Sequence, residues 1–306
     1  MATLQHLVSA LAQLGVDHAN EAAFSTVVDF CATRWDIPVV VTSLYLAMVF
    51  ATRTSISKHS HTRAVERAFA AWNLGLSLFS CWGFVTLSRG LRMAFESEGL
   101  FFTVCAETRS ILRFSEGTPS ALALALFCLS KIPELGDTVF LILKRKPVRL
   151  LQWYHHASVL LFCWLALATQ YTPGVWFAVT NFLVHSVMYL YFFLMTFKGA
   201  AKVVRPIAPL VTMIQIVQMV WGLVVNGIAV GSFFRSGSCQ IQAVTAYAAV
   251  AMYASYFYLF AQMFIEARRA AGKAGGSVTR TLSRKLSQAL LEDSDDGAAN
   301  GSKKLN

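Results

Sequence analysis

Residues 119–143 read PSALALALFCLSKIPELGDTVFLIL, an apolar stretch that three charged residues interrupt. A helix needs about 20 predominantly apolar residues to cross a bilayer, and this stretch is long enough. Charged side chains in a membrane interior are costly unless they pair or face a water-filled cavity, so they mark functional sites. The stretch therefore predicts a membrane-spanning helix that carries part of a functional site through Lys131, Glu134 and Asp137.

The composition of the whole chain also indicates a membrane protein. Of its 306 residues, 56% are hydrophobic and 14% are charged, whereas about 25% of the residues of a soluble domain are charged. The mean hydropathy is +0.54. Residues 1–36 contain no continuous apolar run after a basic start, so no cleavable signal peptide is expected there. We expect the membrane spans themselves to direct insertion.

Seven apolar segments are close to the length that a transmembrane helix needs. Helices and closed barrels are the structures that satisfy their own backbone hydrogen bonds in lipid, so we expect an all-α, multi-pass membrane protein. Pro133 lies inside the third segment and is expected to kink it, because proline lacks a backbone N–H. The predicted spans are residues 37–53, 68–88, 119–143, 150–169, 175–197, 207–230 and 241–265.

Basic residues are concentrated in alternate connections between these spans. The first, third and fifth connections each hold three or four Lys or Arg, and the segment after the last span begins with Arg268, Arg269 and Lys273. By contrast, residues 170–174 hold none, residues 231–240 hold one, and the arginines of residues 89–118 are accompanied by glutamates. The positive-inside rule then puts the C-terminus in the cytosol and the N-terminus in the lumen. The net charge of +10 is explained by this topology, and nucleic-acid binding is not expected.

These features divide the chain into three parts. Residues 1–36 form a lumenal N-terminal segment, residues 37–267 the membrane domain, and residues 268–306 a cytosolic tail. The tail is rich in Gly, Ser and Lys with an acidic run, which is typical of disorder. The tail ends in Lys303-Lys304-Leu305-Asn306, which resembles the dilysine signal for retrieval to the endoplasmic reticulum. We therefore expect a protein of the endoplasmic reticulum membrane.

Two of the six cysteines fall in loops that this topology places in the lumen. They are Cys105 and Cys239. An oxidising lumen would allow them to form a disulfide, and the alternative is two free thiols. The cysteines within the predicted spans are expected to serve as packing residues.

Polar residues fall on one face of each of four predicted helices. At 100° per residue, Lys131 and Glu134 share a face, and Asp137 lies at its edge. A single polar residue on a membrane helix is often a contact between helices worth about 1 kcal/mol. Polar residues on four helices are more informative than a single one, because polar faces that converge would enclose a catalytic chamber. Its other members are Gln152, His155, His156, Asn181, His185, Tyr189, Gln215 and Gln218.

The histidines at membrane depth limit the chemistry of such a chamber. The chain has seven histidines, too few for a di-iron site of the membrane desaturase kind. A zinc ion held by His155, His156 and His185 is conceivable, but the first two are adjacent on a helix and diverge. A neutral histidine acting as nucleophile or general base fits better and needs no metal or other cofactor.

At these residues the chain resembles the ELO family of very-long-chain fatty-acid elongases, which are membrane 3-oxoacyl-CoA synthases. Four segments carry the resemblance, in order and over roughly residues 35–270. Residues 131–138 resemble the K-x-x-E-x-x-D-T motif and residues 152–156 the H-x-x-H-H box. Residues 181–189 resemble N-x-x-x-H-x-x-M-Y, and residues 212–218 resemble T-x-x-Q-x-x-Q. Trp72-Asn73 also has a counterpart in the family.

The resemblance implies seven transmembrane helices around a catalytic chamber and an acyl tunnel. It implies condensation of long-chain acyl-CoA with malonyl-CoA to 3-oxoacyl-CoA, CO2 and CoA. His155 is then the candidate nucleophile, His185 its partner in acyl or malonyl chemistry, and His156 a third catalytic candidate that positions groups or stabilises charge. The remaining candidates are supporting residues, with Lys131, Asn181 and Gln152 as stabilisers of negative charge and Glu134 and Asp137 as the residues that hold Lys131. The resemblance implies the other enzymes of the elongation cycle as protein partners. The oligomeric state is left open, with a homodimer as one alternative.

One position departs from the family pattern, since Gln152 replaces the first histidine of the box. Some elongases, notably algal and protist ones, carry glutamine there, and glutamine cannot change its protonation state. We therefore interpret Gln152, at the first position of the box, as a residue that supports the site through hydrogen bonds. The motifs favour saturated and monounsaturated chains, with a polyunsaturated-chain elongase as the alternative. Two other readings are a seven-span transporter or receptor and an inactive binding member of the same fold.

Overall fold

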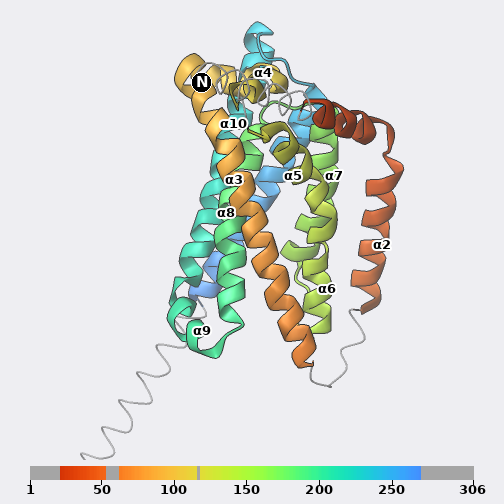
Figure 1. The fold of residues 1–306 in the computed structure, drawn as a ribbon, viewed down its shortest axis with the longest axis vertical. Helices are drawn as coiled ribbons and strands as arrows, with labels where there is room; N and C mark the ends of the chain where they lie inside the picture. Colours follow the sequence, from red (N-terminus) through yellow and green to blue (C-terminus); the bar gives the residue numbers. More distant parts are fainter. Residues whose placement is uncertain (1–20, 53–61, 116–117, 270–306) are drawn as a thin grey trace, which may run out of the picture. The chain divides into compact units, whose positions relative to one another are not determined.

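The computed structural model describes residues 21–52, 62–115 and 118–269, and within these ranges the regular secondary structure is helical (Figure 1). The predicted all-α class is therefore confirmed for the described residues. Residues 1–20 and the predicted tail from residue 270 onward, with its dilysine signal, lie outside them. One compact unit ends at Phe260 and contains all the site residues discussed below.

The helices of this unit follow one another with short connections. A helix at Glu21–Thr33 precedes α2 and is bent from it by 67°. Helix Ala243–Arg269 follows α10 and continues past Phe260. The labelled helices are α2 (Asp36–Thr52), α3 (Arg63–Cys105), α4 (Thr108–Leu112), α5 (Ser120–Glu134), α6 (Gly136–Leu143), α7 (Leu150–Ala168), α8 (Gly174–Met195), α9 (Lys198–Val204) and α10 (Ala208–Ser236).

Five described helical segments are long and apolar enough to cross a membrane, or up to six if a bent pair counts as one span. The five are Arg63–Cys105, Leu150–Ala168, Gly174–Met195, Lys198–Ser236 and Ala243–Arg269, and the bent pair is Glu21–Thr33 with α2. The predicted third span differs because it is divided between α5 and α6. These have 15 and 8 residues, so neither reaches the length of a span alone.

The break between α5 and α6 lies close to the proline that was predicted to kink this span. Pro133 lies in the last turn of α5, and the helix stops at Glu134. The N–H of Leu135 then bonds the carbonyl of Ile132 at 3.2 Å, three residues back. Proline supplies no N–H and its ring crowds the turn before it, and the helix ends within two residues of Pro133. As a consequence, Glu134 and Asp137 belong to different helices.

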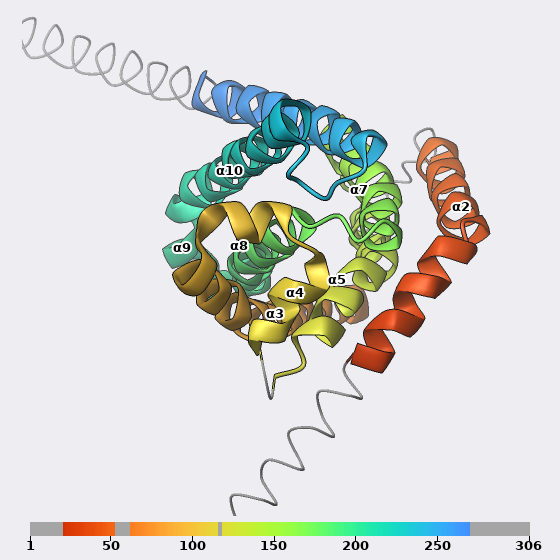
Figure 2. The ribbon, with the colours of Figure 1, turned by 90° about the horizontal axis from the view of Figure 1, so that it is seen from above.

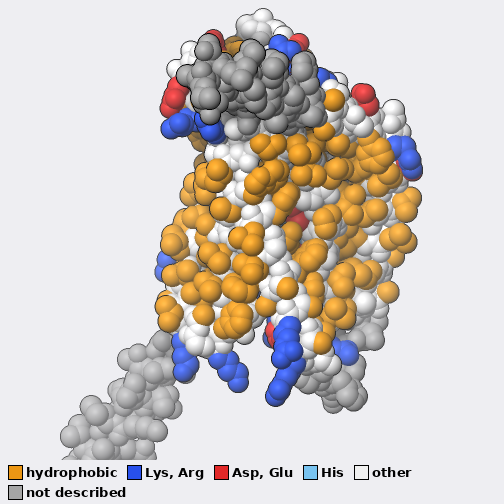
Figure 3. All heavy atoms as spheres, in the orientation of Figure 1, with side chains coloured by type: hydrophobic (Ala, Val, Ile, Leu, Met, Phe, Trp, Pro, Cys, Tyr) orange, Lys and Arg blue, Asp and Glu red, His pale blue; other side chains and the backbone are white. Residues whose placement is uncertain are grey.

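The outer surface of the bundle is apolar. Large side chains such as Leu44, Leu78 and Val85 are more than 60% exposed. Figure 3 shows apolar side chains over most of the visible face, with Lys and Arg at its borders. Apolar exposure on this scale exceeds what monomeric soluble proteins tolerate and is suited to lipid. Together with the spans, it indicates a multi-pass membrane protein.

Close packing between α3 and α8 brings the second and fifth predicted spans together. A Cβ atom at Gly83 of α3 would collide with the ring of Phe182 on α8, so glycine permits this approach. Helix α2 packs instead against α7 and lies outside the other helices in Figure 2. The charged residues and histidines of the predicted site lie on the helices from α3 onward.

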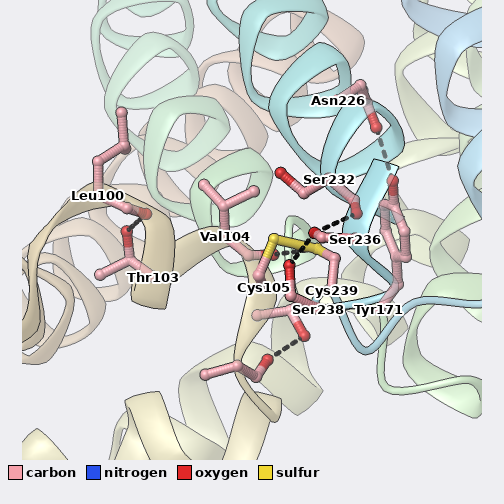
Figure 4. Close-up of a disulfide and its surroundings, with 12 residues drawn as sticks. Leu100, Thr103, Val104, Cys105, Tyr171, Asn226, Ser232, Ser236, Ser238 and Cys239 are labelled. Atoms are coloured by element: carbon pink, nitrogen blue, oxygen red, sulfur yellow. Dashed lines mark hydrogen bonds between the residues drawn. A yellow bond between two sulfur atoms is a disulfide. The ribbon is translucent and has the colours of Figure 1, made fainter. Parts of the chain in front are cut away.

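A disulfide closes one end of the bundle. Cys105 at the end of α3 is bonded to Cys239, which follows α10 (Figure 4). The N–H of Gln240 also donates to the carbonyl of Cys105 at 3.1 Å. Of the two alternatives left open by the sequence, the structure has the disulfide.

Removing this disulfide is expected to destabilise the protein. The bond spans a sequence separation of 134 residues, and loops of this size restrict the unfolded chain strongly. We expect the Cys105→Ser/Cys239→Ser variant to lose about 2–5 kcal/mol of unfolding free energy. Denaturant or SDS titration of the purified protein measures this loss, with Cys81→Ser as the control because Cys81 is an exposed free thiol. Equal stability of the double variant and the wild type would contradict the prediction.

Candidate active site

A buried ion pair forms the centre of the polar cluster. Lys131 and Glu134 are 2% and 3% exposed, and the lysine Nζ lies 2.7 Å from Glu134 Oε1. Lys131 Nζ also donates to Asn181 Oδ1 on α8 at 3.2 Å, and Ser130 Oγ donates to Glu134 Oε1 at 2.9 Å. The prediction that Lys131, Glu134 and Asn181 come together is thus met by direct contacts between α5 and α8.

Asp137 occupies a neighbouring but separate position. Its Oδ1 accepts a hydrogen bond from the Trp72 indole of α3 at 2.7 Å, and its Oδ2 accepts one from the Tyr189 hydroxyl of α8 at 2.7 Å. The expectation that Asp137 helps to hold Lys131 therefore does not describe its hydrogen bonds. The break after Glu134 explains the difference, because Asp137 lies in the first turn of α6 and reaches other helices. Thr138, beside it, shares a 2.8 Å hydrogen bond with Tyr45.

The three histidines lie in two different surroundings. His156 and His185 are buried, and each faces a carboxylate: His156 Nε2 is 3.9 Å from Asp137 Oδ2, and His185 Nδ1 is 3.9 Å from Glu134 Oε2. At this separation neither contact is a normal hydrogen bond. His155 is only partly buried, and its ring lies almost perpendicular to that of His156, with centroids 5.4 Å apart. His155 is therefore the more accessible imidazole.

Tyr256 and Ser158 fix the surroundings of His155. The Tyr256 ring lies 4.8 Å from the imidazole, and its hydroxyl donates to the backbone carbonyl of His155 at 3.2 Å. The same hydroxyl shares a 2.7 Å hydrogen bond with Ser158, one turn farther along α7. Because the imidazole packs on an aromatic ring held at its other end, its orientation is restricted.

A cavity extends from these polar groups into the bundle. His155, Asn181, Gln218, Thr108 and Gln170 contribute polar groups to its wall, and most of the remaining wall is apolar or aromatic. On α7 the lining residues recur on one face from His155 to Leu167 and continue at Gln170 beyond the helix. This is about 22 Å along the axis at 1.5 Å per residue. The other lining residues are Phe24, Thr108, Leu124, Phe127, Cys128, Val159, Phe162, Cys163, Ala166, Tyr171, Gly174, Phe177, Met219, Met252, Tyr253 and Tyr256.

The glutamines predicted as supporting residues do not act as a group. Gln218 is buried and lines the cavity, whereas Gln215 donates to the sulfur of Met188 at 3.2 Å. Gln152 lies in the first turn of α7 and is partly exposed. It is not among the cavity-lining residues. Of the three, Gln218 is therefore the residue placed to meet a bound molecule.

One basic residue of the third connection, Lys144, forms an ion pair. Lys144 Nζ lies 3.0 Å from Glu66 Oε2 and 4.0 Å from the centre of the Phe69 ring. Lys144 therefore ties the end of α6 to the start of α3. As for metals, no group of three His, Cys, Asp or Glu within the described ranges is arranged to hold an ion.

The sequence motifs do not identify several residues of the site. Tyr256 lies in an aromatic-rich helix, where nothing distinguishes it from packing residues. Ser130 bonds Glu134, but a serine next to a charged residue carries no pattern of its own. Trp72 was noticed as part of the resemblance, without its hydrogen bond to Asp137. The contacts of Trp72 and Tyr256 join residues 65 and 101 positions apart, so helical periodicity does not reveal them. Ser130 and Glu134 are only four positions apart on α5.

Comparison with known proteins identifies fatty-acid elongases as relatives of this chain. The family model "ELO: GNS1/SUR4 family" matches residues 30–275. A "very long chain fatty acid elongase 4" of Trypanosoma cruzi is 40% identical over 230 residues, covering 75% of this chain and 79% of the relative. "Fatty acid elongase 3" of Trypanosoma brucei brucei is 35% identical over 251 residues, covering 74% and 82%. "Very long chain fatty acid elongase 6" of Gallus gallus is 34% identical over 234 residues, covering 76% and 85%.

Proposed function

The chain belongs to the ELO (GNS1/SUR4) family, and we propose that it is a condensing enzyme of fatty-acid elongation. It joins a long-chain acyl-CoA to malonyl-CoA and releases CO2 and CoA, leaving a 3-oxoacyl-CoA. One observation supports this assignment most directly: His155 lines a largely apolar cavity whose lining residues continue along α7 from His155 to Leu167. Such a cavity suits an acyl chain, and an imidazole at its head suits the thioester carbonyl.

The first step transfers the acyl group to the protein. A ring nitrogen of His155 attacks the thioester carbonyl carbon, the carbon–sulfur bond breaks, and CoA leaves as a thiol that takes up the imidazole proton. The product is an acyl-imidazole with its chain in the cavity. His155 is favoured over His156 and His185 because the latter two are buried and face Asp137 and Glu134.

The second step forms the new carbon–carbon bond. Malonyl-CoA loses CO2, and the electron pair of the broken bond forms an enolate that attacks the acyl carbonyl carbon. The carbon–nitrogen bond to His155 breaks, and the imidazole takes up a proton. Lys131 and Asn181, joined at 3.2 Å, are the groups assigned to stabilise the developing negative charge. Neither step draws on a metal ion or an organic cofactor.

The carboxylates of Glu134 and Asp137 hold neighbouring side chains in place. Glu134 holds Lys131, while Asp137 anchors Trp72 and Tyr189, and both face a histidine at 3.9 Å. The negative charge of these carboxylates would favour protonated forms of His156 and His185 during the reaction. His185 then assists acyl transfer or the malonyl group, and His156 stabilises charge.

The proposed topology has seven spans, with α5 and α6 together forming the third. The N-terminus is lumenal and the C-terminus cytosolic in the endoplasmic reticulum membrane. The distribution of basic residues supports this orientation, and so does the disulfide, which requires an oxidising side. His155 lies in the second turn of α7, close to the basic connection 144–149. The site is therefore near the cytosolic side, where CoA substrates are available.

A condensation assay tests the function and the chain preference together. Purified protein is incubated with malonyl-CoA labelled in its free carboxyl group and with a panel of saturated, monounsaturated and polyunsaturated acyl-CoAs. We expect release of labelled CO2 that depends on the acyl-CoA, formation of 3-oxoacyl-CoA, and preference for saturated and monounsaturated chains. Absence of CO2 release and of 3-oxo product with every acyl-CoA would contradict the proposed function.

A further inference from the structure

The end of the cavity away from His155 is formed by a segment outside the predicted spans. Phe24 belongs to helix Glu21–Thr33, which lies beside α5 and α7 in both ribbon views (Figures 1 and 2). Its side chain is 1% exposed and lines the cavity together with Thr108 and Gln170. Since Gln170 follows the last residues of α7, Phe24 is at the end of the cavity opposite to His155.

A hydrogen-bond network holds Phe24 in this position. The Arg109 guanidinium lies 5.7 Å from the centre of the Phe24 ring. It donates to Ser25 Oγ, next to Phe24, at 3.1 Å and to Gln170 Oε1 at 3.2 Å. Thr108 Oγ1 also donates to the backbone carbonyl of Gln170 at 2.8 Å. The N-terminal helix is thereby fastened to the end of α7, directly at the cavity.

The backbone at Gln170 is a second sign that this end is specifically built. Gln170 has a φ of +48° and follows α7, and the N–H of Tyr171 bonds the carbonyl of Ala166. This is a helix C-terminus of the kind in which glycine usually occupies the left-handed position. A glutamine there accepts backbone strain. In return, its side chain reaches both Arg109 and the cavity.

From these observations we propose that Phe24 is a specificity-determining residue that sets the longest acyl chain the cavity accepts. The inference rests on the proposed function for the identity of the ligand. An acyl chain with its carbonyl at His155 extends toward Gln170, and its terminal methyl meets the Phe24 ring. Longer chains would have to displace a ring that the N-terminal helix and Arg109 hold in place.

The test uses the full chain and a series of saturated acyl-CoAs of increasing length. The gain in Tm on binding is expected to rise with chain length in the wild type and then stop rising. Phe24→Ala and the milder Phe24→Leu should move this limit to longer chains. Beyond the wild-type limit, the ratio of the acyl-CoA affinity of each variant to that of the wild type should rise about tenfold for every two carbons added to the chain. The reason is that each buried methylene adds favourable transfer free energy. Val28→Ala is the matched control, because Val28 is buried on the same helix but does not line the cavity.

The outcomes separate this inference from the proposed function. An unchanged length limit in both Phe24 variants, or the same change in Val28→Ala, would overturn the role of Phe24. So would the absence of stabilisation by any acyl-CoA. A shifted limit in a protein that binds acyl-CoA but forms no 3-oxo product would support the role of Phe24 and contradict the condensing function.

Discussion

Replacement of His155 by alanine is expected to lower the condensation rate by at least about 10³-fold, because the nucleophile that would carry the acyl group is removed. The imidazole lines the cavity and packs against the Tyr256 ring at 4.8 Å. His156, although adjacent in sequence, is buried and faces Asp137. It is therefore not placed to substitute. Labelled CO2 release and 3-oxoacyl-CoA formation measure the effect.

A neighbouring substitution provides the control for this prediction. Tyr154 precedes His155 on α7, and its hydroxyl shares a 2.9 Å hydrogen bond with Ser255. Tyr154→Phe removes this single hydrogen bond and should change the rate by less than about tenfold. A His155→Ala variant that unfolds at the wild-type temperature and still condenses at a rate close to that of the wild type would exclude His155 as nucleophile.

The second large effect concerns stability. Lys131→Met should lower the unfolding free energy by about 3–5 kcal/mol, because it leaves the buried Glu134 carboxylate without its cation. Glu134 Oε1 would then accept only from Ser130, and Glu134 Oε2 has no hydrogen-bond partner among the described residues. SDS titration in mixed micelles measures the loss.

Removing both charges distinguishes the ion pair from the packing of its side chains. Lys131→Met/Glu134→Gln leaves no uncompensated charge, and we expect it to regain most of the lost stability. Lys144→Met is the matched control, because its partner Glu66 is 41% exposed at the side chain and keeps access to solvent, so we expect a smaller loss than in Lys131→Met. Equal losses in Lys131→Met and in the double variant would contradict the account of a buried pair.

Much of the fold could be predicted from hydrophobic segments and loop charges. Their length located α3, α7, α8 and α10, since an apolar run long enough to cross a bilayer admits few other structures. The prediction was less accurate for the third span, where Pro133 indicated a disturbance but not its extent. The structure has a break at Leu135 rather than a kinked helix, and short-range geometry of this kind depends on the surrounding helices.

The candidate site could be predicted in part for the same reason. Lys131 and Glu134 are three residues apart, so helical periodicity alone brings them together. The role of Asp137 could not be predicted, because it follows the break and bonds Trp72 and Tyr189 from two other helices. Phe24 carried no signal either. Its importance arises from the position of the N-terminal helix at the end of the cavity.

The most direct test of the central claim, that His155 carries the acyl group, is an intact-mass measurement after incubation with acyl-CoA in the absence of malonyl-CoA. We expect a mass increase equal to one acyl group, located on the peptide that contains His155 and lost when malonyl-CoA is added. The adduct should be absent from His155→Ala. An adduct that persists in His155→Ala, or that maps to another residue, would contradict the account.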